Sequence, residues 1–396
     1  MRFFATCALA LEPLLADELT ALGAANVHPT RAGVDFDGTL EVAYRACLWS
    51  RIASRILLPL RAFDAPTPEA LYAGVQRIDW REHLAPGRTL AVDCAATHSA
   101  IGHSHFAALK TKDAIVDQLR ARRGARPDVD VERPDVRVNV YLLKDQATVS
   151  IDLSGESQHR RGYRARAGAP APLKESLAAA VLLHAGWPAR AAERQPLFDP
   201  MCGSGTLAIE AALIAGDAAP GLRREHAGCV GWAGHDGAAW TRLRREAEER
   251  GRAAAKRRSI IVGCDADAGA VQAAEAAARR AGLSGRIRFS HRPLRDCAPP
   301  DGAPPGLLVV NPPYGVRLGD EAKLAPLYAE LGDVLRRRFL GWSAYVLTGS
   351  AALAKRIGLR PARRIPIFNG ALECRLLEFP ISAAPVKESG GPRWRE

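Results

Sequence analysis

Apolar residues in the first 150 positions follow short helical and strand periods that alternate irregularly. Leu11, Leu14, Leu15, Leu19 and Leu22 fall on one helical face, whereas residues 33–38 alternate as a strand does. Together these patterns predict an α+β region rather than a regular βαβ series. The predicted strands are 3–7, 33–38, 55–60, 89–94 and a hairpin of 136–143 with 147–153, and the predicted helices are 11–22, one ending at 49, 68–76 and 106–123.

After about residue 172 the pattern changes to apolar runs separated by helical stretches, which is typical of a parallel sheet. The predicted strands are 197–199, 260–265, 287–290, 307–310, 344–347, 365–368 and 372–379. Asn369-Gly370 separates the last two strands and is a strong hairpin signal, because both residue types tolerate positive φ. A parallel sheet that ends in an antiparallel hairpin is the pattern of class I (Rossmann-like) methyltransferases.

These changes of pattern predict a modular chain. A first region covers 1–60, a second covers 61–154, and a linker of mixed Ser, Gly, Pro and Arg covers 155–172. The parallel-sheet domain covers 173–382, and the polar segment 383–396 is predicted to be a disordered tail.

Charge and cysteine usage narrow the classes of function. The formal net charge is +12, which favours a polyanion partner because Lys and Arg displace the counterions of phosphates. Arg accounts for 47 of the 55 basic residues, so a compositional bias explains part of this charge equally well. The eight Cys form no CxxC pair and no His cluster joins them, so we expect reduced thiols and no metal site. Without an apolar run of about 18 residues, the sequence predicts a cytoplasmic protein rather than a secreted or membrane protein.

The segment Asp199-Pro200-Met201-Cys202-Gly203-Ser204-Gly205-Thr206 lies between a predicted strand and an apolar helix. Glycines at such a turn let a ligand approach the backbone at the start of the helix. Asp199 suits a cationic amino-acid group and would repel a diphosphate, and the segment lacks the Gly-Lys-Ser/Thr of a P-loop. The alternative is a purely structural glycine turn.

Asp265 closes the next predicted strand, where an acid commonly binds ribose hydroxyls. It follows the glycines by about 60 residues instead of the roughly 20 of a nicotinamide-binding fold, which argues against a dehydrogenase. Residues 217–257 fill this interval with Trp232, Trp240 and an Arg-rich helix. They form either a flap over the substrate or a helical decoration.

Asn311-Pro312-Pro313-Tyr314 follows a buried strand and is the most specific signal in the sequence. Two prolines fix the loop. The Asn311 side-chain carbonyl and the Pro312 backbone carbonyl can then hold the two hydrogens of a planar amine, which frees its nitrogen lone pair to attack a sulfonium methyl group. Tyr314 is predicted to stack on the base. The alternative is a proline-rich turn with a core tyrosine.

Two groups of basic residues are candidate RNA contacts. Lys110 and Lys112 lie on the helix 106–123, where a solvated surface explains them nearly as well. The second group lies at the junction of the two halves and consists of Arg160, Arg161, Arg164 and Arg166, beside Tyr163. His98, His103 and His105 lack acidic or cysteine partners nearby and are interpreted as loop residues near RNA.

The glycine segment and the Asn311–Tyr314 segment together resemble those of THUMP-domain class I RNA methyltransferases. The stretches 171–180 and 49–60 also resemble that family, and the similarity covers about residues 2–380. Within the family the chain is most similar to bacterial 23S rRNA guanine-N2 methyltransferases, including Gly231-Trp232 and His235-Asp236. The resemblance implies an N-terminal ferredoxin-like part, a THUMP domain near 43–154 and guanine N2 as the acceptor.

By the same resemblance, S-adenosylmethionine is expected to be held by Asp199, Met201, Gly203, Gly205, Thr206, Asp265 and Asn311, and the base by Asn311, Pro312, Pro313 and Tyr314. Pro293 stands where relatives often have an acid that contacts the adenine amine, so Asp296 is the candidate substitute. Some relatives carry a second methyltransferase domain. This sequence stops after the hairpin, so we expect one methyltransferase domain and no second modification by this polypeptide.

Four other functions compete with methylation of ribosomal RNA. They are guanine-N2 methylation of tRNA, methylation of DNA adenine or protein glutamine, a noncatalytic RNA-binding assembly factor, and a nicotinamide oxidoreductase. The basic N-terminal half argues against a glutamine substrate, and the intact glycine and Asn-Pro-Pro-Tyr segments argue against a noncatalytic factor. No obligate protein partner is inferred.

Overall fold

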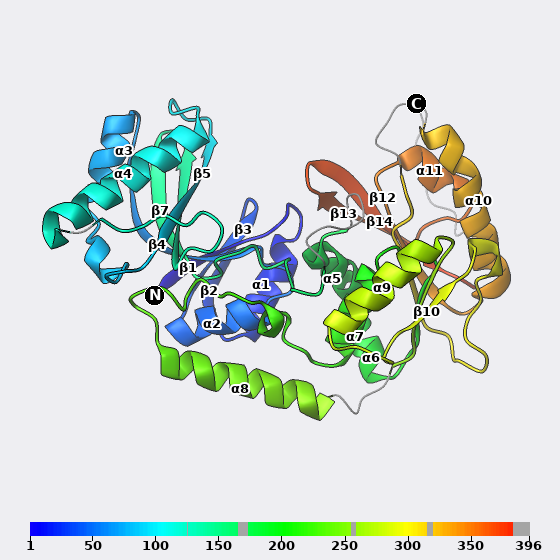
Figure 1. The fold of residues 1–396 in the computed structure, drawn as a ribbon. Coiled ribbons are helices and arrows are strands. Elements are labelled where there is room, and N and C mark those ends of the chain that lie inside the picture. The colour runs from blue at the N-terminus through cyan, green and yellow to red at the C-terminus, as the bar shows by residue number, and fades with distance from the viewer. Residues whose placement is uncertain (125, 165–172, 255–258, 315–319, 383–396) are drawn as a thin grey trace. The chain divides into compact units, whose positions relative to one another are not determined.

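The computed structural model describes residues 1–124, 126–164, 173–254, 259–314 and 320–382, and the chain packs as two compact units (Figure 1). Unit 1 contains Met1–Gly168, Lys174–Ala180 and Gly216–Lys256. Unit 2 contains Ala169–Leu173, Val181–Ala215 and Arg257–Glu396. The proposed tail 383–396 and much of the proposed linker lie outside the described residues. Within the described ranges, no helix is both long and apolar enough to cross a membrane.

Unit 1 is built on one seven-stranded sheet in the order β2-β3-β1-β4-β7-β6-β5, in which only β5 and β6 pair in parallel. Strand β4 is central and pairs with β1 on one side and β7 on the other. The strands are β1 (Arg2–Thr6), β2 (Ala25–Thr30), β3 (Gly33–Asp37), β4 (Arg55–Asp64), β5 (Leu90–Thr97), β6 (Val136–Leu143) and β7 (Gln146–Asp152).

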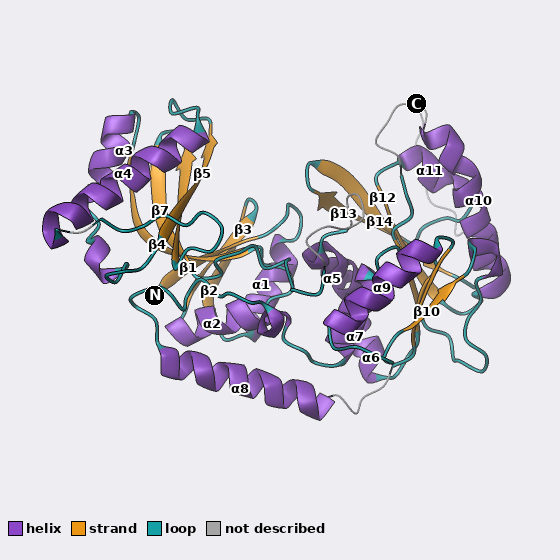
Figure 2. Cartoon of the chain, viewed as in Figure 1, coloured by secondary structure: helices purple, strands orange, loops and turns teal. Residues whose placement is uncertain are grey.

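Helices accompany both ends of this sheet. Helix α1 packs against β2 and β3, and α4 packs against α3 and β5 (Figure 2). The helices of unit 1 are α1 (Glu12–Ala21), α2 (Leu40–Trp49), α3 (Pro68–Gln76), α4 (Ser104–Arg123), α8 (Gly237–Ala254) and the short turns η1 (Trp80–Glu82) and η2 (Pro220–Arg223). Helix α5 (Glu175–His184) runs from unit 1 into unit 2.

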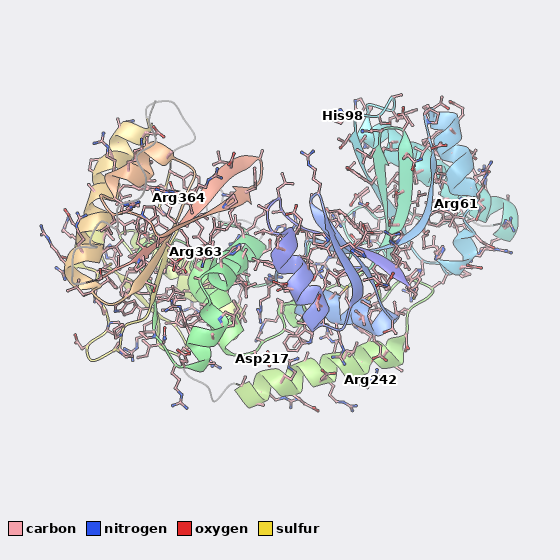
Figure 3. All side chains as sticks on the ribbon, turned by 180° about the vertical axis from the view of Figure 1, so that it is seen from behind. Arg61, His98, Asp217, Arg242, Arg363 and Arg364 are labelled. Atoms are coloured by element: carbon pink, nitrogen blue, oxygen red, sulfur yellow. The ribbon has the colours of Figure 1, made fainter. Side chains whose placement is uncertain are left out.

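The inserted segment of the second half packs on the N-terminal part of the chain. Helix α8 lies against α2, where the Tyr44 hydroxyl contacts His235 Nδ1 at 2.9 Å and accepts a hydrogen bond from the Asp236 backbone N–H at 2.9 Å. The Arg250 guanidinium stacks 3.9 Å from the Trp49 ring centroid. Arg242 of α8, seen in Figure 3, pairs with Glu41. The insertion therefore packs as a helical extension of unit 1.

Unit 2 is a seven-stranded sheet in the order β10-β9-β8-β11-β12-β14-β13. The first five strands in this order pair in parallel, and β14 runs antiparallel to both β12 and β13. The strands are β8 (Leu197–Asp199), β9 (Ile261–Asp265), β10 (Arg288–His291), β11 (Leu307–Val310), β12 (Ser343–Thr348), β13 (Arg363–Asn369) and β14 (Leu372–Pro380). The predicted α/β sheet with a C-terminal antiparallel hairpin, after an α+β region, is confirmed.

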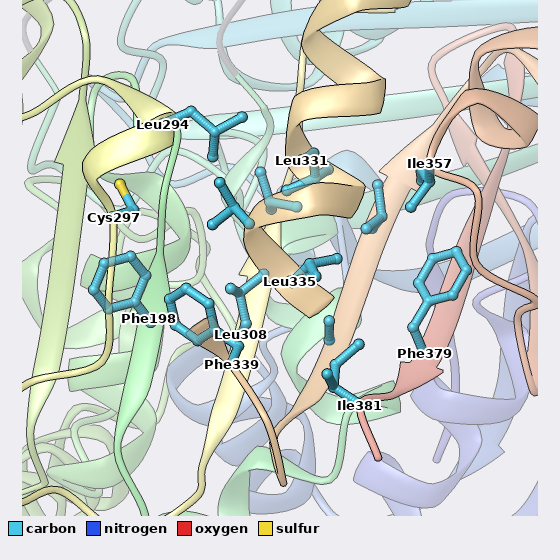
Figure 4. Close-up of a cluster of buried hydrophobic side chains, with 14 of the residues drawn as sticks. Phe198, Leu294, Cys297, Leu308, Leu331, Leu335, Phe339, Ile357, Phe379 and Ile381 are labelled. Carbon is cyan, nitrogen blue, oxygen red and sulfur yellow. The ribbon is translucent and has the colours of Figure 1, made fainter. Parts of the chain in front are cut away.

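Helices and an apolar core hold the strands of unit 2 in place. Helix α10 places Leu331 and Leu335 in a cluster with Phe198, Leu308 and Phe379, all of which are buried (Figure 4). Each such side chain contributes roughly 1.5–3 kcal/mol on burial. The helices are α6 (Trp187–Ala192), α7 (Thr206–Ala215), α9 (Ala268–Arg280), α10 (Asp320–Arg338), α11 (Ala351–Arg356) and the turn η3 (Leu294–Asp296).

The turn between β13 and β14 is one residue later than the sequence predicted. Asn369 pairs with Leu372, so the two connecting residues are Gly370 and Ala371. Gly370 has a φ of +67°, whereas Asn369 is the last residue of the strand. Asn369 instead uses its side chain in the site described below.

Candidate active site

Three strands of unit 2 bring the predicted site residues to one edge of its sheet. Asp199 ends β8, Asp265 ends β9 and Asn311 follows β11 directly. Strand β8 pairs in parallel with both β9 and β11, so the carboxyl ends of the three strands are neighbours. The strand order reverses between β8 and β11. In open α/β sheets such a reversal is where ligands bind.

The loop after β8 is packed on one side and open on the other. The Cys202 N–H donates to the Cys264 carbonyl at 2.8 Å, which ties the loop to β9. Gly203 and Gly205 have φ values of +52° and +78°. A Cβ on Gly205 would lie 2.9 Å from Ala274 Cβ and 3.0 Å from Phe289 Cζ, whereas a Cβ on Gly203 would meet no atom within 4 Å. The space for a ligand therefore lies beside Gly203.

Two carboxylates flank this loop in different environments. Asp199 is buried, and its Oδ1 accepts from the Met201 N–H at 3.2 Å. Burial raises the pKa of Asp199 well above its usual value, and the negative charge of Asp265 raises this pKa further. A cation beside Asp199 would offset both effects, so the environment suits a ligand ammonium group.

The Asp265 side chain accepts hydrogen bonds that position the glycine loop and also has acceptor positions left for a ligand. Its Oδ2 accepts from the Gly203 N–H at 2.8 Å, and its Oδ1 accepts from the Asp267 N–H at 3.0 Å. A carboxylate has about four acceptor positions, so two remain for a ligand such as a ribose diol. The sequence predicted the ligand role but missed this positioning role.

Asn311 carries a buried acceptor without a partner. Its Oδ1 is inaccessible to solvent and has no hydrogen-bond partner among the described residues. An unsatisfied buried acceptor costs about 1–3 kcal/mol. Strand β11, which positions it, is fully buried, and the following Pro312 is buried as well. Since buried polar atoms are normally paired, an acceptor left without a partner among the described residues is the feature expected of a group that pairs with a ligand amine.

Tyr314 is partly buried and firmly placed. Its hydroxyl accepts from Asn369 Nδ2 at 2.9 Å, and its ring packs against the apolar core of unit 2. Burial raises the pKa of Tyr314, so the phenol stays neutral. Sequence reasoning missed Asn369, because it lies 55 residues away along the chain and was interpreted only as part of a turn.

The remaining predicted ligand residues of unit 2 differ in their placement. Thr206 is buried at the start of α7, and Met201 is partly buried and packs against the core of the sheet. Pro313 is exposed. Asp296 is exposed on η3, where its carboxylate lies 4.0 Å from the Arg295 guanidinium.

Among the described residues, the predicted RNA contacts lie in unit 1 and differ in exposure. Arg161 is buried and donates to the carbonyls of Gln158 at 2.9 Å and Arg51 at 2.7 Å. The Arg161 guanidinium therefore satisfies backbone carbonyls inside unit 1. This burial corrects the interpretation of Arg161 as an RNA contact. Arg164 Nε lies 3.3 Å from the buried carboxylate of Glu175. Arg166 lies outside the described residues.

The other basic candidates remain accessible to different degrees. Arg160 is exposed, 3.9 Å from Glu156. Lys110 Nζ lies 5.3 Å from the centroid of the Tyr72 ring, and Lys112 pairs with Asp113 at 2.7 Å. Of the three predicted loop histidines, His98 and His103 are exposed in loops, whereas His105 is exposed in the first turn of α4.

Three sequence models of protein families match the chain. The RMKL-like methyltransferase domain matches residues 161–378, the RlmL ferredoxin-like domain matches 2–57, and the THUMP domain matches 65–152. The first match alone covers more than half of the chain.

Curated relatives carry the name ribosomal RNA large subunit methyltransferase K/L. The protein of Syntrophotalea carbinolica is 53% identical over 384 residues, and that of Methylococcus capsulatus is 55% identical over 380 residues. Each alignment covers 96% of this chain but only 54% and 51% of the respective relative. The chain thus spans about half the length of these relatives.

A solved structure matches the chain along its whole length. It is SMU.472, crystallised with S-adenosylhomocysteine, and it is 33% identical with a TM-score of 0.85. The match covers 97% of this chain and 99% of that one. Together with the family matches, this similarity shows that the chain belongs to the RMKL-like methyltransferase domain family, with ferredoxin-like and THUMP domains at its N-terminus.

Proposed function

We propose that the chain transfers a methyl group from S-adenosylmethionine to the exocyclic N2 amine of a guanine in 23S ribosomal RNA. The family membership and the name of the curated relatives support the reaction class and the RNA. The observation that carries the proposal is the buried Oδ1 of Asn311, which has no partner among the described residues and lies at the strand-order reversal beside the glycine loop. The proposed compartment is the cytoplasm.

The cofactor is proposed to bind against the glycine loop. Asp199 would pair with its ammonium group, Gly203 and Gly205 would give the backbone room, and Asp265 would accept from the ribose hydroxyls. Thr206, Met201 and Asp296 complete the proposed set. The open space beside Gly203 and the raised pKa of Asp199 fit a ligand of this shape and charge. When bound, the cofactor supplies an electrophilic methyl group on a sulfonium.

The base is proposed to be held by the segment Asn311–Tyr314. Asn311 Oδ1 would accept one hydrogen of the amine, and the Pro312 carbonyl would accept the other. This orients the nitrogen lone pair away from the ring plane, and Tyr314 would stack on the base. Because orientation supplies most of the rate in such a transfer, losing one of these contacts is expected to lower kcat by about 100-fold. A base in structured RNA must first be exposed or flipped out.

Unit 1 is proposed to bind the RNA through its THUMP part and through the basic segment that follows it. Lys110, Lys112, Arg160 and Arg164 are the proposed contacts, together with Arg166 outside the described residues. Arg160 is exposed, which suits a phosphate contact, whereas Arg164 would have to share its guanidinium with Glu175.

The test is methylation with radiolabelled S-adenosylmethionine on separate samples of 23S rRNA, tRNA and DNA, followed by digestion and identification of the labelled nucleoside. We expect N2-methylguanosine in 23S rRNA. Label in tRNA alone would keep the mechanism and replace the substrate, and label on adenine would overturn the proposed acceptor. Cofactor binding without label in any nucleic acid would contradict the proposal as a whole.

A further inference from the structure

A groove in unit 2 lies on the outer side of the C-terminal hairpin. Its volume is about 690 Å³, and it is lined by the end of β12, by α11 and the loop after it, and by one face of the β13–β14 hairpin. We call it the hairpin groove and define it by Gly349, Lys355, Arg360, Arg364, Glu373 and Arg375. None of these residues belongs to the proposed cofactor or base set.

The charge of the groove is strongly positive. Four of its fourteen lining residues are cations and one is an acid. Arg375 pairs with that acid, Glu373. In the part of the chain that the structure describes, the side chains of Lys355, Arg360 and Arg364 are exposed and make neither an ion pair nor a hydrogen bond. One further carboxylate, Glu321, accepts from the Ser350 hydroxyl at the edge of the groove.

The pairing of the hairpin strands directs Arg364 into the groove. Arg364 pairs with Leu377, another lining residue, whereas its neighbour Arg363 pairs with Glu378 (both arginines are labelled in Figure 3). Successive residues of a strand point to opposite faces. Arg363 accordingly forms an ion pair with Glu378 at 3.4 Å on the other face, and Arg364 stays free for a ligand.

The groove borders the proposed base site through Gly349, which packs against the Tyr314 ring. Gly349 lines the groove, and a Cβ on it would lie 3.1 Å from Tyr314 Cδ2. The same Tyr314 hydroxyl is held by Asn369 at the end of β13. A nucleotide whose base stacks on Tyr314 would place its neighbouring backbone near Gly349, one of the residues that line the groove.

We propose that the hairpin groove binds the phosphates of nucleotides that flank the methylated guanine in single-stranded RNA. This inference rests on the proposed function and adds a second RNA-binding element, within the catalytic unit itself. Two arginines with free guanidinium groups suit phosphate oxygens, because the planar fork can donate two parallel hydrogen bonds. The apolar floor made by Leu359 and Leu377 leaves room for ribose between the charges.

The test uses a triple variant with a matched control. The groove variant is Lys355→Ala/Arg360→Ala/Arg364→Ala. The control is Arg337→Ala/Arg338→Ala/Arg356→Ala, which removes three exposed cations of the same unit that do not line the groove; Arg356 is the direct neighbour of Lys355 on α11. Both variants lose the same charge, so a general effect of net charge acts on both.

The first readout is the salt dependence of binding to a short single-stranded oligoribonucleotide with one guanine. Each phosphate contact contributes about −0.7 to the slope of log K against log salt concentration. The slope of the groove variant should therefore be shallower than that of the parent by about 2, and its affinity at physiological salt should be about tenfold or more lower. The KM for 23S rRNA should rise while kcat at saturating RNA stays near the parent value. The control should keep the parental slope.

Equal slopes for the groove variant and the control would overturn the proposal, as would competition by poly-L-glutamate as strong as that by RNA. Binding of S-adenosylhomocysteine is measured by calorimetry on all three proteins. Unchanged cofactor binding shows that unit 2 is folded in both variants. The difference between their salt-dependence slopes then tests the groove assignment directly. Absence of cofactor binding in the parent protein would instead overturn the proposed function on which the groove assignment rests.

Discussion

The two glycines of the loop after β8 should respond differently to the same substitution. Gly203 and Gly205 both have positive φ, so alanine at either position costs about 1–2 kcal/mol of backbone strain. Only at Gly205 does the added methyl group meet neighbours, at 2.9 Å from Ala274 and 3.0 Å from Phe289. Overpacking of this kind costs about 1–3 kcal/mol more.

We therefore expect Gly205→Ala to destabilise unit 2 by about 2–5 kcal/mol and Gly203→Ala by about 1–2 kcal/mol. For a unit of roughly 200 residues this corresponds to Tm decreases of about 4–20 °C and about 2–8 °C. At Gly203 the methyl group instead enters the space proposed for the cofactor, so the main effect there should be loss of cofactor affinity.

The assay is differential scanning calorimetry with and without S-adenosylhomocysteine, combined with titration calorimetry. The parent Tm should rise with ligand, because ligand binding stabilises the folded state by mass action. Gly203→Ala should lose most of that ligand-induced rise while keeping most of its own Tm. Parental cofactor affinity in Gly203→Ala, or equal destabilisation by both alanines, would refute the assignment of open and packed sides of the loop.

Three further perturbations test other parts of the account. Asp199→Asn should weaken S-adenosylmethionine binding by about 30-fold or more, because the ligand ammonium loses a buried carboxylate. Since the pKa of Asp199 is raised in the folded protein, the cofactor affinity of the parent protein should fall as pH falls through that pKa. Titration calorimetry that finds no pH dependence of this affinity would contradict the assignment. Burial, together with Lys174 and nearby Arg residues, lowers the pKa of His159 to about 4. The stability that neutral His159 contributes is therefore present above its unfolded pKa near 6.5 and is lost as pH falls from 6.5 to about 4. The Tm of the parent protein should decline over this window, and a flat Tm profile from pH 7.5 to 4 that His159→Gln leaves unchanged would contradict this linkage. Asn369→Ala should free the Tyr314 hydroxyl and raise the KM for RNA without changing cofactor affinity; equal KM values would show that this hydrogen bond does not position the ring.

The catalytic half was predictable from sequence because its central strands, β8, β9, β11 and β12, are buried on both faces. Such strands appear as short apolar runs, and β8 and β11 begin and end at the predicted residues. The polar residues at their carboxyl ends, Asp199 and Asn311, follow directly from that assignment. The structure then adds what residue spacing cannot supply: the side-chain oxygen of Asn311 is buried and has no partner within the described ranges.

Features that depend on contacts distant in sequence were missed. Strand β2 (Ala25–Thr30) is mostly exposed at the edge of its sheet and contains Asn26 and Pro29, so no apolar alternation marks it. Arg161 looked like a surface charge, because only the fold reveals that the carbonyl of Arg51, 110 residues away, accepts its hydrogen bond. The attachment of α8 to α2 likewise has no local sequence signal.

The most direct test of the central claim is the identity of the nucleoside labelled by the parent protein and by Asn311→Ala, compared at equal occupancy of S-adenosylmethionine. The account predicts N2-methylguanosine in 23S rRNA with the parent and a rate about 100-fold lower with Asn311→Ala, whose cofactor affinity should fall far less than that of Asp199→Asn. An undiminished rate in Asn311→Ala, or a labelled nucleoside other than N2-methylguanosine, would contradict it.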